Sequence, residues 1–201
     1  MFTPGFARHR AARYRKKGLD RTARRMVELL ARRGLEGATV LEIGGGVGEI
    51  GVELLRRGAA SVTNLELSPA YEAEAARLLA EAGLTGRVHR RLLDIAADPD
   101  AVGPADVVVL HRVVCCYPDY ARLLGAAADR TRRQLALTHP SRNLVTRTVV
   151  AAQNLFFRLL DREFRVFAHP PAAMHALLDQ HGLHPTRAHG GPVWQLTTAT
   201  R

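Results

Sequence analysis

The sequence predicts an α/β protein in which a helical arm precedes a domain built on a parallel sheet. Two observations support this. From residue 38 onward, short apolar runs that fit buried strands alternate with stretches of helical periodicity, a pattern typical of βαβ units. Residues 1–37 instead are helical in pattern and strongly basic. A length of 201 residues suits one domain, so we assign residues 38–201 to it.

The arm, residues 1–37, holds almost all of the net charge. The chain carries +10, and residues 1–33 contribute +9 through 11 basic and 2 acidic residues. We expect a helix over 7–17 and an amphipathic helix over 21–33 that is capped by Asp20. The charge has two interpretations: a clamp for an anionic partner such as nucleic acid, a membrane surface or an acidic substrate, or a solvated helix in an Arg-rich sequence.

Five strands and their connecting helices are expected in the first part of the domain. Apolar runs predict strands at 39–43, 61–67, 87–95, 105–111 and 133–139. Helical periodicity between them predicts helices at 49–57, 69–82 and 119–131. Strands that alternate with helices in this way pair in parallel, because each helix returns the chain to the same edge of the sheet.

The pattern changes after the fifth strand. We expect a helical stretch over 143–162, a short extended piece over 164–169, and a helix that opens at Pro171. Residues 184–200 then read as two strands around a Gly-Gly-Pro turn, which predicts a closing antiparallel hairpin.

The composition argues against several classes of protein. The first residues lack the apolar core of a secretory signal, and no apolar run reaches the ~18 residues of a membrane span. Cys115 and Cys116 are adjacent and are the only cysteines, so they form neither a disulfide framework nor a zinc pattern. The nine histidines are scattered. We therefore expect a cytoplasmic protein without a membrane span or a metal site.

A glycine-rich turn after the first strand is the strongest functional signal. Residues 42–48 read Glu-Ile-Gly-Gly-Gly-Val-Gly. Glycines let the backbone approach a ligand closely, and the helix that follows offers free N–H groups. The second and third predicted strands end near Glu66 and Asp94, and an acid at the first of these ends can accept both hydroxyls of a ribose. Ligands bind at the carboxyl ends of such strands, so we expect a nucleotide-like ligand there.

A competing motif overlaps this turn. Gly46, Gly48 and Gly51 spell the dinucleotide fingerprint G-x-G-x-x-G, and Glu66 follows at the expected distance. However, Gly46 lies three residues beyond the strand, and the fingerprint leaves the acid and the first glycine of the turn unused. A nicotinamide enzyme also needs a substrate domain, for which the chain has little room. We therefore favour a different nucleotide-like cofactor.

Taken together, the ordered motifs resemble the class I S-adenosylmethionine-dependent methyltransferases over about residues 38–199. The resemblance is carried by the turn at 42–48, the acids Glu66 and Asp94, the strand at 106–111, the stretch 112–119 and the final strand at 191–196. It implies a Rossmann-like, seven-stranded, mostly parallel sheet in the order 3-2-1-4-5-7-6 with helices on both faces. It also implies S-adenosyl-L-methionine as cofactor and S-adenosyl-L-homocysteine as product.

The resemblance further implies which residues bind the cofactor. These are Glu42, Gly44, Gly45, Gly46, Glu66, Leu67, Asp94, Ile95 and His111. In chain order, the three acids would face the amino group, the ribose hydroxyls and the adenine amino group. The glycines would face the methionine part, the two apolar residues would pack on the adenine, and His111 would lie beside the transferred methyl group.

Two histidines and one connecting segment are candidates for catalysis and acceptor binding. His111 and His139 end the fourth and fifth strands, so each is a candidate general base or a positioned polar residue. Family members carry a substrate lid where this chain has residues 141–170, a segment that mixes Arg with Phe. Such a lid suits a flat or anionic molecule, although a core-covering helix with solvated arginines is the alternative. The expected acceptor-pocket residues are Tyr14, Cys115, Tyr117, Arg142, Arg147 and Asn154.

The predicted function is in-line methyl transfer from S-adenosyl-L-methionine to a small anionic or aromatic acceptor. A weaker similarity to the magnesium-protoporphyrin O-methyltransferase branch points the same way, and we expect Tyr14 to Gly18 to fold over the cofactor mouth. An RNA or protein methyltransferase that uses the basic arm is an alternative, opposed by the lack of an Asn/Asp-Pro-Pro-aromatic loop and of a basic stripe on the domain. A cofactor-binding interaction protein without activity is a third. No acceptor atom or oligomeric state is predicted.

Overall fold

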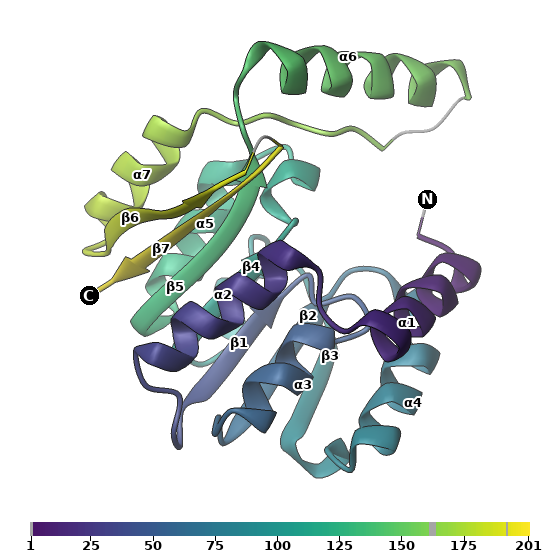
Figure 1. The fold of residues 1–201 in the computed structure, drawn as a ribbon. Coiled ribbons are helices and arrows are strands. Elements are labelled where there is room, and N and C mark those ends of the chain that lie inside the picture. The colour runs from purple at the N-terminus through teal and green to yellow at the C-terminus, as the bar shows by residue number, and fades with distance from the viewer. Residues whose placement is uncertain (1, 161–163, 192) are drawn as a thin grey trace.

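A seven-stranded sheet organises the chain (Figure 1). The computed structural model describes residues 2–160, 164–191 and 193–201; parts of the predicted helix 143–162, of the lid 141–170 and of the Gly-Gly-Pro turn lie outside them. The strands are β1 (Thr39–Ile43), β2 (Ser61–Glu66), β3 (Val88–Leu92), β4 (Ala105–His111), β5 (Thr131–Pro140), β6 (His184–Gly190) and β7 (Trp194–Thr200). Their order is β3-β2-β1-β4-β5-β7-β6, and β7 is antiparallel to both neighbours, which confirms the predicted fold.

The helices agree with the predicted ranges to within a few residues. They are α1 (Pro4–Lys17), α2 (Arg21–Arg32), α3 (Glu49–Arg56), α4 (Glu72–Ala82), α5 (Tyr120–Asp129), α6 (Leu144–Leu159) and α7 (Pro171–Gln180). Short 3-10 turns lie at η1 (Pro69–Tyr71), η2 (Thr85–Arg87), η3 (Pro99–Ala101) and η4 (Val114–Cys116). Helix α1 begins earlier than predicted because the Thr3 hydroxyl caps it by accepting from the Phe6 N–H.

Helices pack on both faces of the sheet. Val40, Val107 and Val109 join the core formed with α1, α2, α3 and α4, whereas Leu41 and Val108 join the core formed with α5 and α7. Neighbouring residues of one strand enter different cores because successive side chains point to opposite faces. Since both faces are covered, the central strands read as continuous apolar runs.

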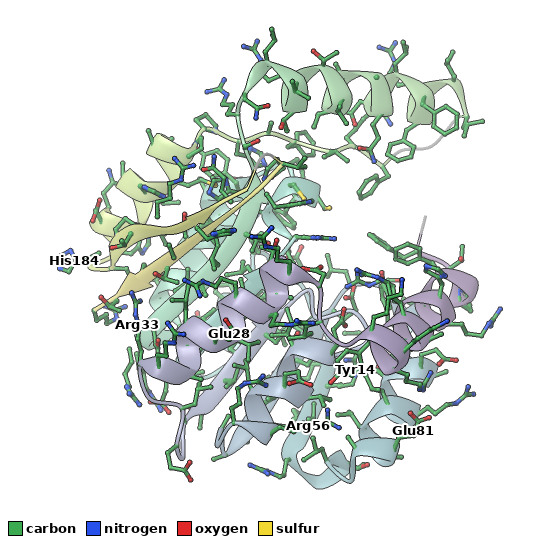
Figure 2. All side chains as sticks on the ribbon, in the orientation of Figure 1. Tyr14, Glu28, Arg33, Arg56, Glu81 and His184 are labelled. Atoms are coloured by element: carbon green, nitrogen blue, oxygen red, sulfur yellow. The ribbon has the colours of Figure 1, made fainter. Side chains whose placement is uncertain are left out.

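The basic arm is docked on the domain. Ala7, Ala11 and Tyr14 form one buried side of α1. Arg15 pairs with Glu81 at 2.7 Å and lies 3.7 Å from Glu74, both on α4, and Tyr14 lies beside Arg56 of α3 (Figure 2). Exposed pairs stabilise only slightly, so apolar burial holds the helix and the pairs neutralise part of its charge. Neither sequence interpretation foresaw this arrangement.

Helix α6 lies apart from the sheet at the periphery of the molecule (Figure 1). It follows β5, and the extended residues 164–170 return the chain to α7. Its domain-facing side includes the buried Thr146, whose hydroxyl lies 2.8 Å from that of Ser141. Within the described part of the chain, no helix combines the length and the apolar character needed to cross a membrane.

Replacing Leu30 with Ala should lower the unfolding free energy by about 2–5 kcal/mol, because the truncation leaves a cavity in a packed core. Leu30 is fully buried on the side of α2 that faces the sheet. Urea denaturation followed by circular dichroism would measure the change. Arg32→Ala, an exposed position of the same helix, is the control and should change stability by no more than about 0.5 kcal/mol. Equal effects of the two variants would contradict this packing.

Candidate functional site

A cavity of about 660 Å³ opens at the carboxyl ends of β1, β2 and β4. Its volume is typical of a site for a small molecule or cofactor. The nine residues that the sequence assigned to the cofactor all line it: Glu42, Gly44, Gly45, Gly46, Glu66, Leu67, Asp94, Ile95 and His111. The structure therefore brings these residues together, although they come from four separate segments of the chain.

The glycine turn between β1 and α3 is held against β2. The N–H of Gly44 donates to the carbonyl of Leu65 at 2.7 Å. Gly44 and Gly46 have φ values of +64° and +57°, which only glycine adopts without strain. A Cβ on Gly45 would overlap the amide of Asn64, which is fully buried. The turn thus leaves a smooth backbone surface on the cavity, with no side chain in the way of a ligand.

The carboxyl group of Glu42 joins the elements beneath this turn. One of its oxygens accepts from the Asn64 amide of β2 at 2.8 Å and from the Gly51 N–H of α3 at 3.2 Å. Burial, reinforced by the nearby negative charge of Glu49, raises the pKa of Glu42 to about 8. Glu42 is therefore mostly neutral near pH 7. Asn64 was not identified from the sequence, because nothing in its strand marks it as more than a buried polar residue.

Two carboxylates at the rim of the cavity are held by hydrogen bonds from the protein. Glu66 accepts from the N–H of Gly46 at 2.8 Å, and its other oxygen accepts from the N–H groups of Leu67 and Ser68. Asp94 accepts from the Tyr117 hydroxyl at 2.9 Å. Carboxylate oxygens have two acceptor positions each, so both groups can still accept hydrogen bonds from a ligand.

His111 lies in a polar cluster that joins the arm to the cavity. Its Nδ1 is 3.2 Å from the Thr138 hydroxyl, and its Nε2 is 3.5 Å from Asp20. Arg112 lies 3.0 Å from the same Asp20 oxygen and stacks on the Trp194 ring at 4.7 Å. Burial opposes the ionisation of Asp20, yet hydrogen bonds from His111 and the backbone, with the charge of Arg112, keep its pKa below the ordinary value. Asp20, which the sequence predicted as the cap of α2, thus also positions His111 and Arg112.

Two of the predicted site residues lie outside the cavity lining. His139 does not line the cavity; it is buried, and its ring lies between the carbonyl of Pro140 and the hydroxyl of Thr197. Strand β5 continues past His139 and pairs there with β7. Burial also lowers the pKa of His139. Tyr14 likewise lies away from the cavity mouth, because its side of α1 packs on the domain and its hydroxyl donates to Glu53 at 2.8 Å.

The predicted acceptor residues divide into two groups. Tyr117 lines the cavity, and so does Cys116 in place of the buried Cys115. Arg142 and Arg147 are exposed and lie outside the cavity lining. Asn154 is also outside it, where its amide group exchanges two hydrogen bonds of 2.8 Å with the backbone of Val166. Asn154 therefore holds the returning chain against α6 and does not face the cavity.

An aromatic cluster that the sequence analysis missed closes one side of the cavity. We define it as Phe2, Phe6, Tyr71 and Phe164, all of which line the cavity. Phe2 meets the edge of the Phe164 ring at 5.8 Å and lies 5.8 Å from the Tyr71 ring. Arg10, one turn further along α1, also lines the cavity and pairs with Glu49. The N-terminal part of the arm therefore covers the mouth of the cavity, and its Tyr14 end does not. In the sequence, the two phenylalanines at positions 2 and 6 were the feature that could have indicated this.

Comparison with known proteins agrees with this geometry. Residues 40–134 match the family model described as a methyltransferase domain. A search of curated protein sequences found no significant match. The structure is similar to a magnesium protoporphyrin IX methyltransferase from Synechocystis PCC 6803 with bound SAH (S-adenosylhomocysteine). That match has a TM-score of 0.73 and 22% identity over 90% of this chain and 82% of the other.

Two further structures show the same fold. An O-methyltransferase family protein from Burkholderia thailandensis matches with a TM-score of 0.71 and 22% identity over 90% of this chain and 56% of that one. A putative sarcosine dimethylglycine methyltransferase from Galdieria sulphuraria matches with a TM-score of 0.71 and 14% identity, over 90% of this chain and 85% of that one. Residues 40–134 are therefore similar to a methyltransferase domain, and the chain has the fold of S-adenosylmethionine-dependent methyltransferases, as the resemblance stated from the motifs implies.

Replacing Glu42 with Gln should make stability less dependent on pH. Between the ordinary pKa of 4.5 and the raised value of about 8, the folded chain holds a proton on Glu42 that the unfolded chain has lost. Ionisation of this group therefore lowers the unfolding free energy as pH rises, by up to about 1.4 kcal/mol per pH unit. Urea denaturation of the wild type and of Glu42→Gln near pH 5 and near pH 8, about the two ends of this window, would measure the change in unfolding free energy. An unchanged difference between wild type and variant at the two pH values would contradict the raised pKa.

Proposed function

We propose that this methyltransferase domain transfers the methyl group of S-adenosyl-L-methionine to a small molecule with a flat apolar body and an acidic group. The observation that carries the proposal is the composition of one cavity. We call the glycine turn with the carboxylates of Glu66 and Asp94 its floor; the aromatic cluster and Arg112 also line it. The floor suits a nucleoside, and the second set of residues suits a flat, acidic acceptor.

The residues of the floor fit S-adenosyl-L-methionine. The carboxylate of Glu66 has one acceptor position left for a ribose hydroxyl, and Asp94 accepts from the adenine amino group. The glycine turn faces the methionine part, where the Glu42 carboxyl group lies near the amino group. The guanidinium of Arg10, next to Glu49, is placed to bind the methionine carboxylate. The cofactor supplies the activated methyl group and its leaving group, so the protein has only to position the acceptor and exclude water.

The acceptor lies between the glycine turn and the aromatic cluster. Phe164 and Phe2 contact its flat body, as aromatic rings do in edge or offset contacts. Arg112, rigidly held by Asp20 and Trp194, pairs with its acidic group. His111 borders the methyl group and, if the acceptor is a phenol or an alcohol, takes its proton. A carboxylate acceptor attacks without a base.

The docked arm favours a small acceptor over RNA. Arg10 and Arg15 are paired with glutamates of α3 and α4, so part of the positive charge of the arm is already neutralised by the domain. A nucleic-acid surface needs such cations free to contact phosphates. The arm instead contributes Phe2 and Phe6 to the cavity, which is the function we assign to it.

Calorimetric titration with S-adenosylhomocysteine should show binding to the wild type. Glu66→Ala should weaken this binding by about tenfold or more, since it removes a hydrogen-bond acceptor of the ribose and the group that holds the glycine turn through the Gly46 N–H. Glu36→Ala, an exposed acid outside the cavity, is the matched control and should bind as the wild type does. Binding of NADH in place of S-adenosylhomocysteine would contradict the proposal.

Arg10→Gln should weaken S-adenosylhomocysteine binding by about tenfold, because a charge-assisted hydrogen bond to the carboxylate is lost. Arg8→Gln on the same helix is exposed and outside the cavity, so it should leave the affinity unchanged. The same titration measures both variants. Equal affinities of the wild type and Arg10→Gln for S-adenosylhomocysteine would show that Arg10 does not bind the cofactor.

An acceptor screen should find activity with small aromatic acids. S-adenosylhomocysteine release would be measured with sets of planar acids, phenols and amines, and with transfer RNA. We expect turnover with planar molecules that carry a carboxylate, because the aromatic cluster and Arg112 face the same space. Arg112→Gln should raise KM for such acids without a matching rise for uncharged analogues. Methylation of transfer RNA alone would favour the alternative function.

A further inference from the structure

Helix α6 exposes an apolar face to solvent. Leu144 and Leu159 are each 76% exposed, and Phe156 is 58% exposed. The large apolar side chains exposed on this helix and at its C-terminal cap are Leu144, Val145, Val149, Leu155, Phe156, Leu159 and Leu160. Single exposed apolar residues are common, but a contiguous group marks an interaction surface.

The apolar side chains point away from the domain. Thr146, Asn154 and Phe157 share the side of α6 that faces the domain: Thr146 is buried, Asn154 bonds Val166, and Phe157 lies 5.5 Å from Phe164. At 100° per residue, Val145 and Leu159 fall on the opposite side. Figure 2 shows side chains standing on this outer side, and none of the other elements that the structure describes lies over them. The helix is thus amphipathic with its apolar face turned outward.

Basic residues flank this face, and α6 itself carries no acidic residue. Residues 141–160 contain Arg142, Arg147 and Arg158 but neither Asp nor Glu, and Asp-Arg-Glu follows at 161–163. The three arginines are exposed. Arg147 and Arg158 are eleven residues apart, which is about three turns, so they lie along one edge of the apolar face. An apolar face bordered by arginines is typical of helices that lie in the interface of anionic membranes.

We propose that α6 docks this protein on an anionic membrane surface, with the helix lying in the plane of the lipid headgroups. The charges select this partner. A second copy packed face to face would bring Arg147 and Arg158 of each α6 together, and α6 itself carries no acidic side chain, whereas anionic headgroups neutralise them. Sixteen residues span about 24 Å, which suits a helix that lies on the surface.

The same helix is fixed to the cavity. Asn154 holds the backbone of Val166, and Phe157 contacts Phe164, a member of the aromatic cluster. The next residues continue along the rim, where the N–H of Phe167 donates to the carbonyl of Cys115 at 2.7 Å. Docking of α6 therefore places the aromatic side of the cavity near the lipid. If the proposed function holds, the acceptor reaches the cavity from the membrane.

Flotation of the full chain with lipid vesicles tests the docking. We expect binding to vesicles in which roughly a third of the phosphatidylcholine is replaced by phosphatidylglycerol, and much weaker binding to phosphatidylcholine alone or at high salt. The double variant Leu155→Ser with Leu159→Ser should lower the partition coefficient by about tenfold or more. Leu92→Ser on β3 is the control, because Leu92 and Leu155 are both 55% exposed.

The charge contribution has its own variant pair. Arg158→Gln should lower binding to the anionic vesicles by about fivefold, as expected for one cation near a charged surface. Arg77→Gln, an exposed arginine of α4, should have no effect. Circular dichroism of every variant would confirm that it remains folded.

Three results would overturn the docking. They are no flotation with anionic vesicles, equal flotation of the wild type and the Leu155→Ser/Leu159→Ser variant, or a dimer in sedimentation velocity that this variant abolishes. The last result would assign the face to a second copy. Binding of S-adenosylhomocysteine is measured in a separate experiment. A protein that floats with the vesicles but does not bind S-adenosylhomocysteine would contradict the proposed function and leave the membrane docking supported.

Discussion

The buried carboxyl group of Glu42 is the contact on which the geometry of the cavity depends. It ties the end of β1 to Asn64 of β2 and to Gly51 of α3, so the glycine turn between them has one position. Arg90 completes the arrangement by donating to Asn64 and to the carbonyl of Gly46. A buried hydrogen-bonded network of this kind favours one structure, and it leaves a backbone surface on which a flat ligand can lie.

The N-terminal arm and the α6 segment complete the site from outside the sheet. Phe2 of the arm and Phe164 of the returning chain come from segments far apart in the sequence and meet at the cavity. Asp20 caps α2 and at the same time holds Arg112 against the rim. The positive charge of the arm therefore has a structural explanation: acids of α3 and α4 balance part of it where α1 packs, and the arm serves the site with its apolar residues.

The sequence predicted the fold and the grouping of the proposed cofactor residues in one cavity, because both follow from local patterns. Strand ends and the glycine turn fix where Glu66 and Asp94 lie, and helices between strands fix the parallel pairing. Contacts set by helix rotation or strand length were not predictable. Tyr14 was misplaced because a basic helix does not show which side it buries, and His139 because β5 runs one residue further. The outward face of α6 was also missed, since periodicity shows an apolar stripe without showing what covers it.

The most direct test is the number of protons exchanged when S-adenosylhomocysteine binds near pH 7. With its pKa raised to about 8, Glu42 is largely protonated in the free protein. A bound ammonium group beside it would lower that pKa and release most of one proton. Titration calorimetry in buffers of different ionisation enthalpy measures this release. We expect a release of close to one proton for the wild type and close to none for Glu42→Gln. Binding heats that are independent of the buffer in the wild type, or no binding at all, would contradict the account.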